Sequence, residues 1–198
     1  MSVSENLTKV REEINEAARR AGRDPGDVTL IAVSKTKPVS LIKEAVAAGA
    51  ADLGENKPQE ITAKYPEFEG DNVRWHMIGH LQKNKVRHII DKVELIHSID
   101  SVELAEEINK RAAAIDKIQK ILIQVNVTGE DSKSGISPQD TEELCRRISE
   151  LDNVRIMGLM TISVNGYTYE ENKKVFESLA GLAARIDDMH IKNVSMKE

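Results

Sequence analysis

The sequence predicts an α/β protein in which helices flank a parallel sheet, and three observations support this fold class. Short apolar segments rich in β-branched residues alternate with amphipathic helical segments along the whole chain. The apolar segments are continuous, as expected for strands that are covered on both faces. No linker or change in composition divides the chain, so we expect one domain over residues 1–198. The alternation is typical of an open doubly wound sheet or of a (β/α)8 barrel.

The first elements can be read from spacing and turn residues. Residues 3–21 place apolar side chains three and four apart with charges between them, which predicts an amphipathic helix. Gly22 and the turn sequence at 24–27 end that helix. The first strand is expected at 28–34, and helical spacing returns at 40–49.

The same alternation continues to the end of the chain. Further strands are expected at 52–54, 74–78, 95–98, 121–127, 156–160 and 191–195, which makes seven, and helices are expected at 59–64, 84–91, 102–114, 138–151 and 169–186. The strands recur about every 27 residues, and a closed barrel of this kind needs eight of them. The length therefore predicts a barrel that is roughly one βα unit short.

Composition excludes several classes of protein. With 33 acidic and 28 basic residues the formal net charge is −5, which argues against a general nucleic-acid binder. The single cysteine, Cys145, can form neither an internal disulfide nor a metal cage, and a reducing compartment suits it. The sequence shows neither a signal peptide nor an apolar run long enough to cross a membrane. We expect a cytoplasmic protein with no membrane partner.

Nucleotide-binding signatures are missing from the sequence. A Rossmann sheet should carry a Gly-x-Gly-x-x-Gly turn after its first strand. Here that strand is followed by Lys35-Thr36-Lys37-Pro38, without a glycine, and no Walker A sequence is present. Neither dinucleotide nor P-loop nucleotide binding is predicted.

In parallel βα architectures the ligand binds at the carboxyl ends of the strands. The residues that end the predicted strands are mostly polar or small: Lys35, Glu55, Asn56, Gly79, His80, Asp100, Ser101, Asn126, Thr128, Met160, Thr161, Ser195 and Met196. We expect a ligand site to be built from members of this set.

Lys35 stands out because it closes the most apolar strand. In a partly dry pocket a lysine is shifted toward its neutral amine, the form that attacks an aldehyde. The alternative is a solvated lysine with a structural role, and periodicity alone does not separate the two. Lys37, just before Pro38, is expected to face solvent.

Other residues of the set allow both a ligand role and a structural one. Asn56 follows Gly54 and could either orient a ligand or cap a helix. Filling of the core is the default role for Met160. His76 and His80 have the i, i+4 spacing of a helical metal pair, but they lie in a predicted strand, where such side chains do not converge. No metal site is expected.

Seven stretches of the chain form a recognisable set: residues 30–38 (LIAVSKTKP), 53–56 (LGEN) with Gln59 and Glu60, 75–85 (WHMIGHLQKNK), 99–101 (IDS), 124–126 (QVN), 133–135 (KSG) and 158–162 (GLMTI). Together they resemble the pyridoxal phosphate homeostasis proteins, whose fold is like the N-terminal barrel domain of alanine racemase. The similarity runs from about residue 3 to about residue 196.

The resemblance implies a cofactor and a set of residues for it. Lys35 would form a Schiff base with pyridoxal 5′-phosphate, Asn56 would lie close to the pyridine ring, and Met160 would line the pocket from the sixth strand. Ser195 would begin the phosphate-binding loop. The family binds and buffers this cofactor in vitamin B6 homeostasis without an established catalytic turnover, so the resemblance implies a small-molecule partner and no enzyme activity.

The sequence also departs from the family pattern. In the family a Ser-Met-Gly-Met-Ser phosphate loop follows the seventh strand and leads to a helix and an eighth strand, whereas here Lys197 replaces the glycine of that loop. We expect a TIM-type (β/α)8-like barrel, truncated at its C-terminus, that has an extra N-terminal helix and lacks the last helix and eighth strand. An open edge of this kind predicts a monomer or weak self-association.

Two other functions remain open from the sequence. One is a pyridoxal-phosphate-dependent amino-acid racemase, although racemases of this fold use a tyrosine base from a large second domain. The other is a truncated apo form that has lost tight cofactor binding, because the missing elements supply most of the phosphate contacts in the family.

Overall fold

A curled parallel sheet lies at the centre of the computed structural model, which describes residues 2–130, 134–164 and 166–198. In this part of the chain the sheet has six strands in sequence order, each parallel to the next. The strands are β1 (Ile31–Val33), β2 (Asp52–Glu55), β3 (Arg74–Met77), β4 (Val93–Ile99), β5 (Gln119–Gln124) and β6 (Val154–Met160). The predicted α/β class with a parallel sheet is confirmed.

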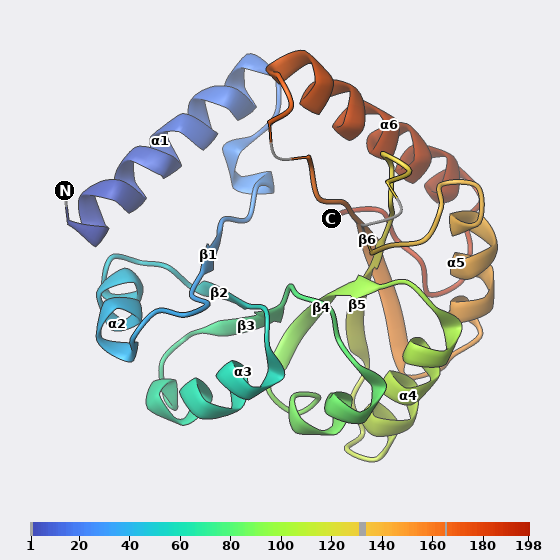
Figure 1. Cartoon of the computed structure of the whole chain (residues 1–198), viewed down its shortest axis with the longest axis horizontal. Coiled ribbons are helices and arrows are strands. Elements are labelled where there is room, and N and C mark those ends of the chain that lie inside the picture. The colour runs from blue at the N-terminus through green and yellow to red at the C-terminus, as the bar shows by residue number, and fades with distance from the viewer. Residues whose placement is uncertain (1, 131–133, 165) are drawn as a thin grey trace.

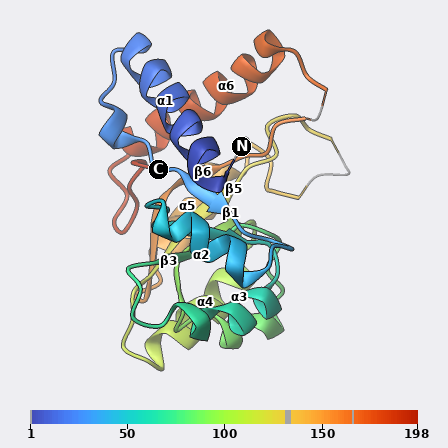
Figure 2. The same ribbon diagram turned by 90° about the vertical axis from the view of Figure 1, so that its left-hand side faces the viewer.

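The helices lie around the outside of the sheet (Figure 1). They are α1 (Val3–Arg20), α2 (Val39–Ala47), α3 (Pro58–Lys64), α4 (Val102–Ala113), α5 (Thr141–Ser149) and α6 (Tyr169–Asp188), with the 3₁₀ helices η1 (Pro25–Asp27), η2 (Tyr65–Phe68) and η3 (Lys83–His88). Figure 2 shows α1 and α6 on the opposite side of the molecule from α3 and α4. The arrangement is that of a barrel with its helices outside.

Capping side chains explain where the two longest helices begin. Ser2 accepts a hydrogen bond from the Glu5 backbone N–H, and the Glu5 carboxylate accepts one from the Ser2 N–H. Thr168 and Glu171 form the same reciprocal pair at the start of α6. This reciprocal pair is a capping box, and it satisfies two backbone N–H donors that a helix leaves free at its N-terminus.

The core fills the space between the sheet and its outer helices. Large side chains without solvent exposure come from β2 to β5 and from the helices that cover them, among them Leu53, Ile61, Met77, Ile96, Ile108 and Ile121. Trp75 packs edge to face on Phe68 with ring centroids 5.7 Å apart. All of these belong to one continuous apolar cluster that extends from α2 to α6. Within the described ranges, no helix has the length and apolarity needed to cross a bilayer.

Three expected elements need correction. The first strand covers only the last part of 28–34, because β2 begins at Asp52, opposite Ile31, and offers no earlier partner. The helix expected at 84–91 is the shorter 3₁₀ helix η3, and burial of Val86 within it and of Ile89 and Ile90 just after it accounts for the helical spacing.

The seventh strand expected at 191–195 does not join the sheet as a strand. Its only bridge among the described residues pairs Val194 with Ile156 of β6. Nearby, His190 and Asn193 have φ values of 50° and 60°, a left-handed backbone that interrupts an extended run. The described sheet therefore has six strands where seven were predicted.

Candidate functional site

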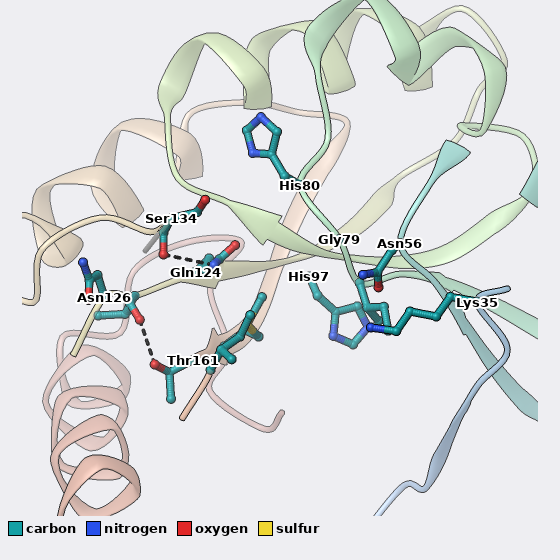
Figure 3. A pocket seen from close by; sticks show the side chains of 13 residues that line it. Lys35, Asn56, Gly79, His80, His97, Gln124, Asn126, Ser134 and Thr161 are labelled. Atoms are coloured by element: carbon teal, nitrogen blue, oxygen red, sulfur yellow. Dashed lines mark hydrogen bonds between the residues drawn. The ribbon is translucent and has the colours of Figure 1, made fainter. Parts of the chain in front are cut away.

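A cavity of about 580 Å³ opens at the carboxyl ends of the strands, where the sequence predicted a ligand site (Figure 3). Residues from β4 to β6 and from the loops after β1, β2, β3, β5 and β6 line it: Lys35, Asn56, Ile78, Gly79, His80, His97, Gln124, Val125, Asn126, Ser134, Met160, Thr161 and Ile162. This lining contains no carboxylate, so among the described residues nothing at the wall repels an anionic ligand.

The cavity brings together three of the four residues named from the sequence. Lys35, Asn56 and Met160 all line it. Ser195 does not: its backbone N–H donates to the carbonyl of Ile156, well before the end of β6. The hydroxyl of Ser195 is buried and has no hydrogen-bond partner in the described structure.

The backbone on both sides of Lys35 is held by polar contacts. The Ser34 N–H donates to the carbonyl of Gly54 at 3.0 Å, and the Thr36 N–H donates to a Glu60 carboxylate oxygen at 2.8 Å. Thr36 has a φ of 61°, a left-handed conformation that a threonine rarely adopts. The exposed Lys35 side chain thus starts from a fixed turn and reaches into the cavity, where Figure 3 shows it pointing toward His97.

A buried ionic cluster beneath this turn provides the anchoring groups. Lys64 Nζ donates to Glu55 at 2.7 Å, to Glu60 at 2.8 Å and to the carbonyl of Ser34 at 2.9 Å. Burial raises the pKa of Glu55, and hydrogen bonds from Lys64 and Ser34 only partly oppose it. Burial alone would lower the pKa of Lys64, but its two carboxylate partners raise it. Lys64 therefore keeps its charge and ties α3 to the turn that carries Lys35.

Asn56 is fixed by a close approach of two loops. A Cβ atom on Gly79 would lie 2.4 Å from the carbonyl oxygen of Asn56 and 2.7 Å from its Cα. Only glycine leaves room for the loop after β2 to pass this closely over the loop after β3. Ser98 holds the same loop by donating to the Gly79 carbonyl at 2.7 Å.

Amide and hydroxyl groups form the wall at the end of β5. Gln124 donates to the carbonyl of Ser134 at 3.0 Å, and Thr161 donates to the carbonyl of Val125 at 2.9 Å. A parallel bridge between Val125 and Ile136 docks the returning loop against β5. Lys133, part of one of the recognised stretches, lies outside the described residues.

A chain of buried polar side chains leads from the cavity toward the amino ends of the strands. His97 and His76 are joined by their ring nitrogens Nε2 and Nδ1 at 3.0 Å, and His76 Nε2 lies 2.9 Å from Asp52 Oδ1. Arg74 holds both oxygens of Asp52 at 2.6 Å. Burial alone would raise the pKa of Asp52, but hydrogen bonds from Arg74 and His76 lower it. Burial, reinforced by His76, lowers the pKa of His97 to about 4.

His76 and His80 have different surroundings. His76 pairs with Asp52 and His97, whereas His80 faces the cavity, so the two do not converge. No group of three or more candidate metal ligands occurs among the residues that the structure describes. Cys145 is buried, and burial raises the pKa of its thiol to about 12, which suits an inert core residue.

Sequence reasoning missed His97, Gln124 and the Glu55–Lys64 cluster. His97 lies two residues before the end of β4, so a search restricted to strand ends passes over it. Alternation was the available signal, because residues two apart along a strand share a face. Conversely, Asp100, Ser101 and Thr128 were in the strand-end set and do not line the cavity.

A profile of the family described as "Alanine racemase, N-terminal domain" matches residues 6–197. The pyridoxal phosphate homeostasis protein of Aquifex aeolicus is 41% identical over 182 residues, which covers 92% of this chain and 80% of that protein. These two findings are independent of the cavity.

Solved structures agree with the sequence relatives. A protein of unknown function from Bifidobacterium adolescentis superposes with a TM-score of 0.90 at 32% identity, covering 96% of this chain and 81% of that one. PipY from Synechococcus elongatus, with PLP bound, gives a TM-score of 0.84 at 32% identity and covers 98% of this chain and 86% of that one. Alanine racemase of Corynebacterium glutamicum, at 15% identity and a TM-score of 0.72, shares the fold.

Proposed function

Because this chain belongs to the alanine racemase N-terminal domain family and, within it, to the pyridoxal phosphate homeostasis proteins, we propose that it binds pyridoxal 5′-phosphate in cofactor homeostasis. One observation carries the proposal: Lys35, on an anchored turn, lines the cavity at the carboxyl ends of the strands. The names of the relatives and the PLP-bound state of PipY support the choice of ligand.

The lining of the cavity fits this cofactor. The aldehyde requires a primary amine, which Lys35 supplies, and a dianionic phosphate requires a wall without carboxylates. The amides of Asn56 and Asn126 and the hydroxyls of Ser134 and Thr161 surround the same space. At about 580 Å³ the cavity has the volume of an ordinary small-molecule site.

The residues have distinct roles in the proposal. Lys35 holds the aldehyde, the Asn56 amide orients the ring, and Met160 supplies an apolar wall. Ser195 stays a prediction from the family pattern, because it does not line the cavity. The buried Glu55–Lys64 cluster acts through the backbone by holding the turn that carries Lys35.

When bound, pyridoxal 5′-phosphate supplies an aldehyde for reversible capture by an amine. The neutral amine of Lys35 attacks the carbonyl carbon, a C=N bond replaces C=O, and one water leaves with the carbonyl oxygen and both amine hydrogens. No electrons are gained or lost. The charged ammonium must first give up one proton, so a proton acceptor near Lys35 would speed the capture.

We infer that this chemistry serves storage and delivery of the cofactor rather than turnover of a substrate. The name "homeostasis protein" given to the relatives supports that role. A racemase remains the alternative of another class, and a racemisation assay on amino acids with the loaded protein separates the two: turnover would favour the racemase.

Borohydride trapping tests the proposal. The protein is incubated with pyridoxal 5′-phosphate, reduced with borohydride and digested, and the modified peptide is mapped by mass spectrometry. We expect one label on Lys35, absent in Lys35→Ala and retained in Lys37→Ala, whose lysine is exposed and does not line the cavity. No label at saturating cofactor would contradict the proposal and favour an apo protein.

A further inference from the structure

The Asp52–His76–His97 chain connects the cavity of Lys35 to a buried carboxylate, and nothing in the proposed function uses it. All three residues are at least nine-tenths buried, with exposed fractions of 5%, 5% and 8%. We propose that this chain is a proton relay that exchanges a proton with the amino group of Lys35 during capture and release of the cofactor aldehyde. The inference rests on the proposed function and deepens it.

The relay requires a resting state in which both imidazoles are neutral. A carboxylate only accepts, so His76 Nε2 carries a hydrogen and donates it to Asp52 Oδ1. Neutral His76 then accepts at Nδ1, so His97 Nε2 carries the hydrogen between the two rings. What remains is Nδ1 of His97, which has no hydrogen-bond partner among the described residues and presents a lone pair.

In the proposal this lone pair faces the amino group of Lys35. His97 lines the same cavity as Lys35, and the two side chains point toward each other in Figure 3. No hydrogen bond joins them among the described residues, and pairs of this kind often tighten only when the ligand binds. Figure 3 shows His80 on another part of the wall, away from this pair.

Charge explains why two histidines are needed. A buried cation on His97 is unfavourable, and burial accordingly lowers its pKa to about 4. In the relay a proton received at Nδ1 moves on to His76, where the positive charge lies 2.9 Å from the Asp52 carboxylate. The Arg74 guanidinium keeps Asp52 ionised through its two bonds of 2.6 Å.

The transfer conserves protons and charge. One N–H bond of the Lys35 ammonium breaks as Nδ1 of His97 gains a hydrogen, and the hydrogen on His97 Nε2 passes to His76 Nδ1. The hydrogen on His76 Nε2 stays on that atom throughout and keeps its hydrogen bond to Asp52. One positive charge thereby moves from Lys35 to His76, and the same steps in reverse return the proton when the cofactor is released.

Nuclear magnetic resonance of the ring nitrogens tests the relay in the ligand-free protein. With ¹⁵N-labelled histidine we expect hydrogen on Nε2 of both His76 and His97 and a bare Nδ1 on His97 at neutral pH. Hydrogen on Nδ1 of His97 would overturn the relay, because that atom could then accept nothing from Lys35. The measurement does not depend on cofactor binding.

Rates of capture provide the second test. Stopped-flow absorbance with pyridoxal 5′-phosphate gives the capture rate, and dilution gives the release rate, for His97→Gln, His76→Gln and the matched control His88→Gln, whose ring is exposed and outside the cavity. Glutamine at position 76 can donate to Asp52 and accept from His97 but cannot pass a proton on. We expect both rates to fall about 10²-fold in the first two variants, with the dissociation constant changed less than about threefold, since a relay lowers one barrier for both directions.

The outcomes are distinguishable. Wild-type rates in His97→Gln, or weaker binding at unchanged rates, would overturn the relay while leaving Lys35 as the capturing residue. A drop in His97→Gln but not in His76→Gln would also overturn it, because His97 would then act alone. If the wild-type protein captures no cofactor at Lys35, the proposed function fails and the relay fails with it.

Discussion

His97 is a buried imidazole whose neutrality has a consequence for stability. Its pKa falls from 6.5 to about 4 on folding, chiefly because of burial, with the neighbouring His76 as the second cause. Between these two values the unfolded chain binds a proton that the folded protein does not. The stabilisation from a neutral His97 is therefore complete above pH 6.5 and is lost as the pH falls toward 4.

We predict that the free energy of unfolding drops by about 2 kcal/mol between pH 7 and pH 5 through this residue alone. Urea titrations at both pH values measure it, and the drop should shrink in His97→Gln but persist in His88→Gln, where the substituted histidine is exposed. An equal drop in the wild type and in His97→Gln would assign the pH dependence to other groups.

A site residue could be predicted only where the sequence around it carries a recognisable feature. Lys35 could be identified because a lysine that follows a run of apolar residues is conspicuous, and the family motifs named Asn56 and Met160. The pairing of His97 with His76 and of Lys64 with Glu55 could not be identified, since these partners lie 21 and 9 residues apart and only the folded chain brings them within 3.0 Å. A buried polar contact has no local signature in the sequence.

At the scale of elements, the loop after β3 depends on a glycine. A Cβ on Gly79 would overlap the Asn56 backbone, 2.4 Å from its carbonyl oxygen. We predict that Gly79→Ala costs about 1–3 kcal/mol of unfolding free energy, as overpacking usually does, and weakens cofactor capture by displacing Asn56. Chemical denaturation and the borohydride label on Lys35 measure the two effects.

The same substitution elsewhere provides the control. Gly181 lies on the exposed face of α6, where a new Cβ would meet nothing within 4 Å. Gly181→Ala should stabilise the protein by about 0.5–1 kcal/mol, because alanine restricts the unfolded chain and favours the helix. Equal losses in both variants would show that the close contact at Gly79 does not matter.

Elements were predictable where periodicity and pairing agree. The helix α1 was predicted with its ends nearly correct, because apolar spacing and Gly22 both mark it. The segments 28–30 and 191–195 both have strand-like composition. The first has no paired residue in β2, and the second forms a single bridge with β6. Pairing is a property of two segments, so a single segment could not reveal it.

At the scale of the whole molecule, one apolar cluster joins elements from α2 to α6. The cavity lies at one end of the strands that carry this cluster, and its walls come from β4 to β6 and from the loops after β1, β2, β3, β5 and β6. A ligand held there contacts elements from both halves of the chain. Ligand binding should therefore stabilise the whole folded chain against unfolding.

We predict that pyridoxal 5′-phosphate raises the midpoint of thermal unfolding of the whole chain in a single transition. A ligand that binds only the folded state at 100 times its dissociation constant adds about 2.7 kcal/mol, which corresponds to roughly 5–10 °C for a domain of this size. Differential scanning calorimetry should show the shift in the wild type and in Lys37→Ala, and little of it in Lys35→Ala. A comparable shift in Lys35→Ala would mean that the phosphate and ring contacts, rather than the amine, dominate binding. A second unfolding transition whose midpoint does not change with the cofactor would contradict a single cooperative unit.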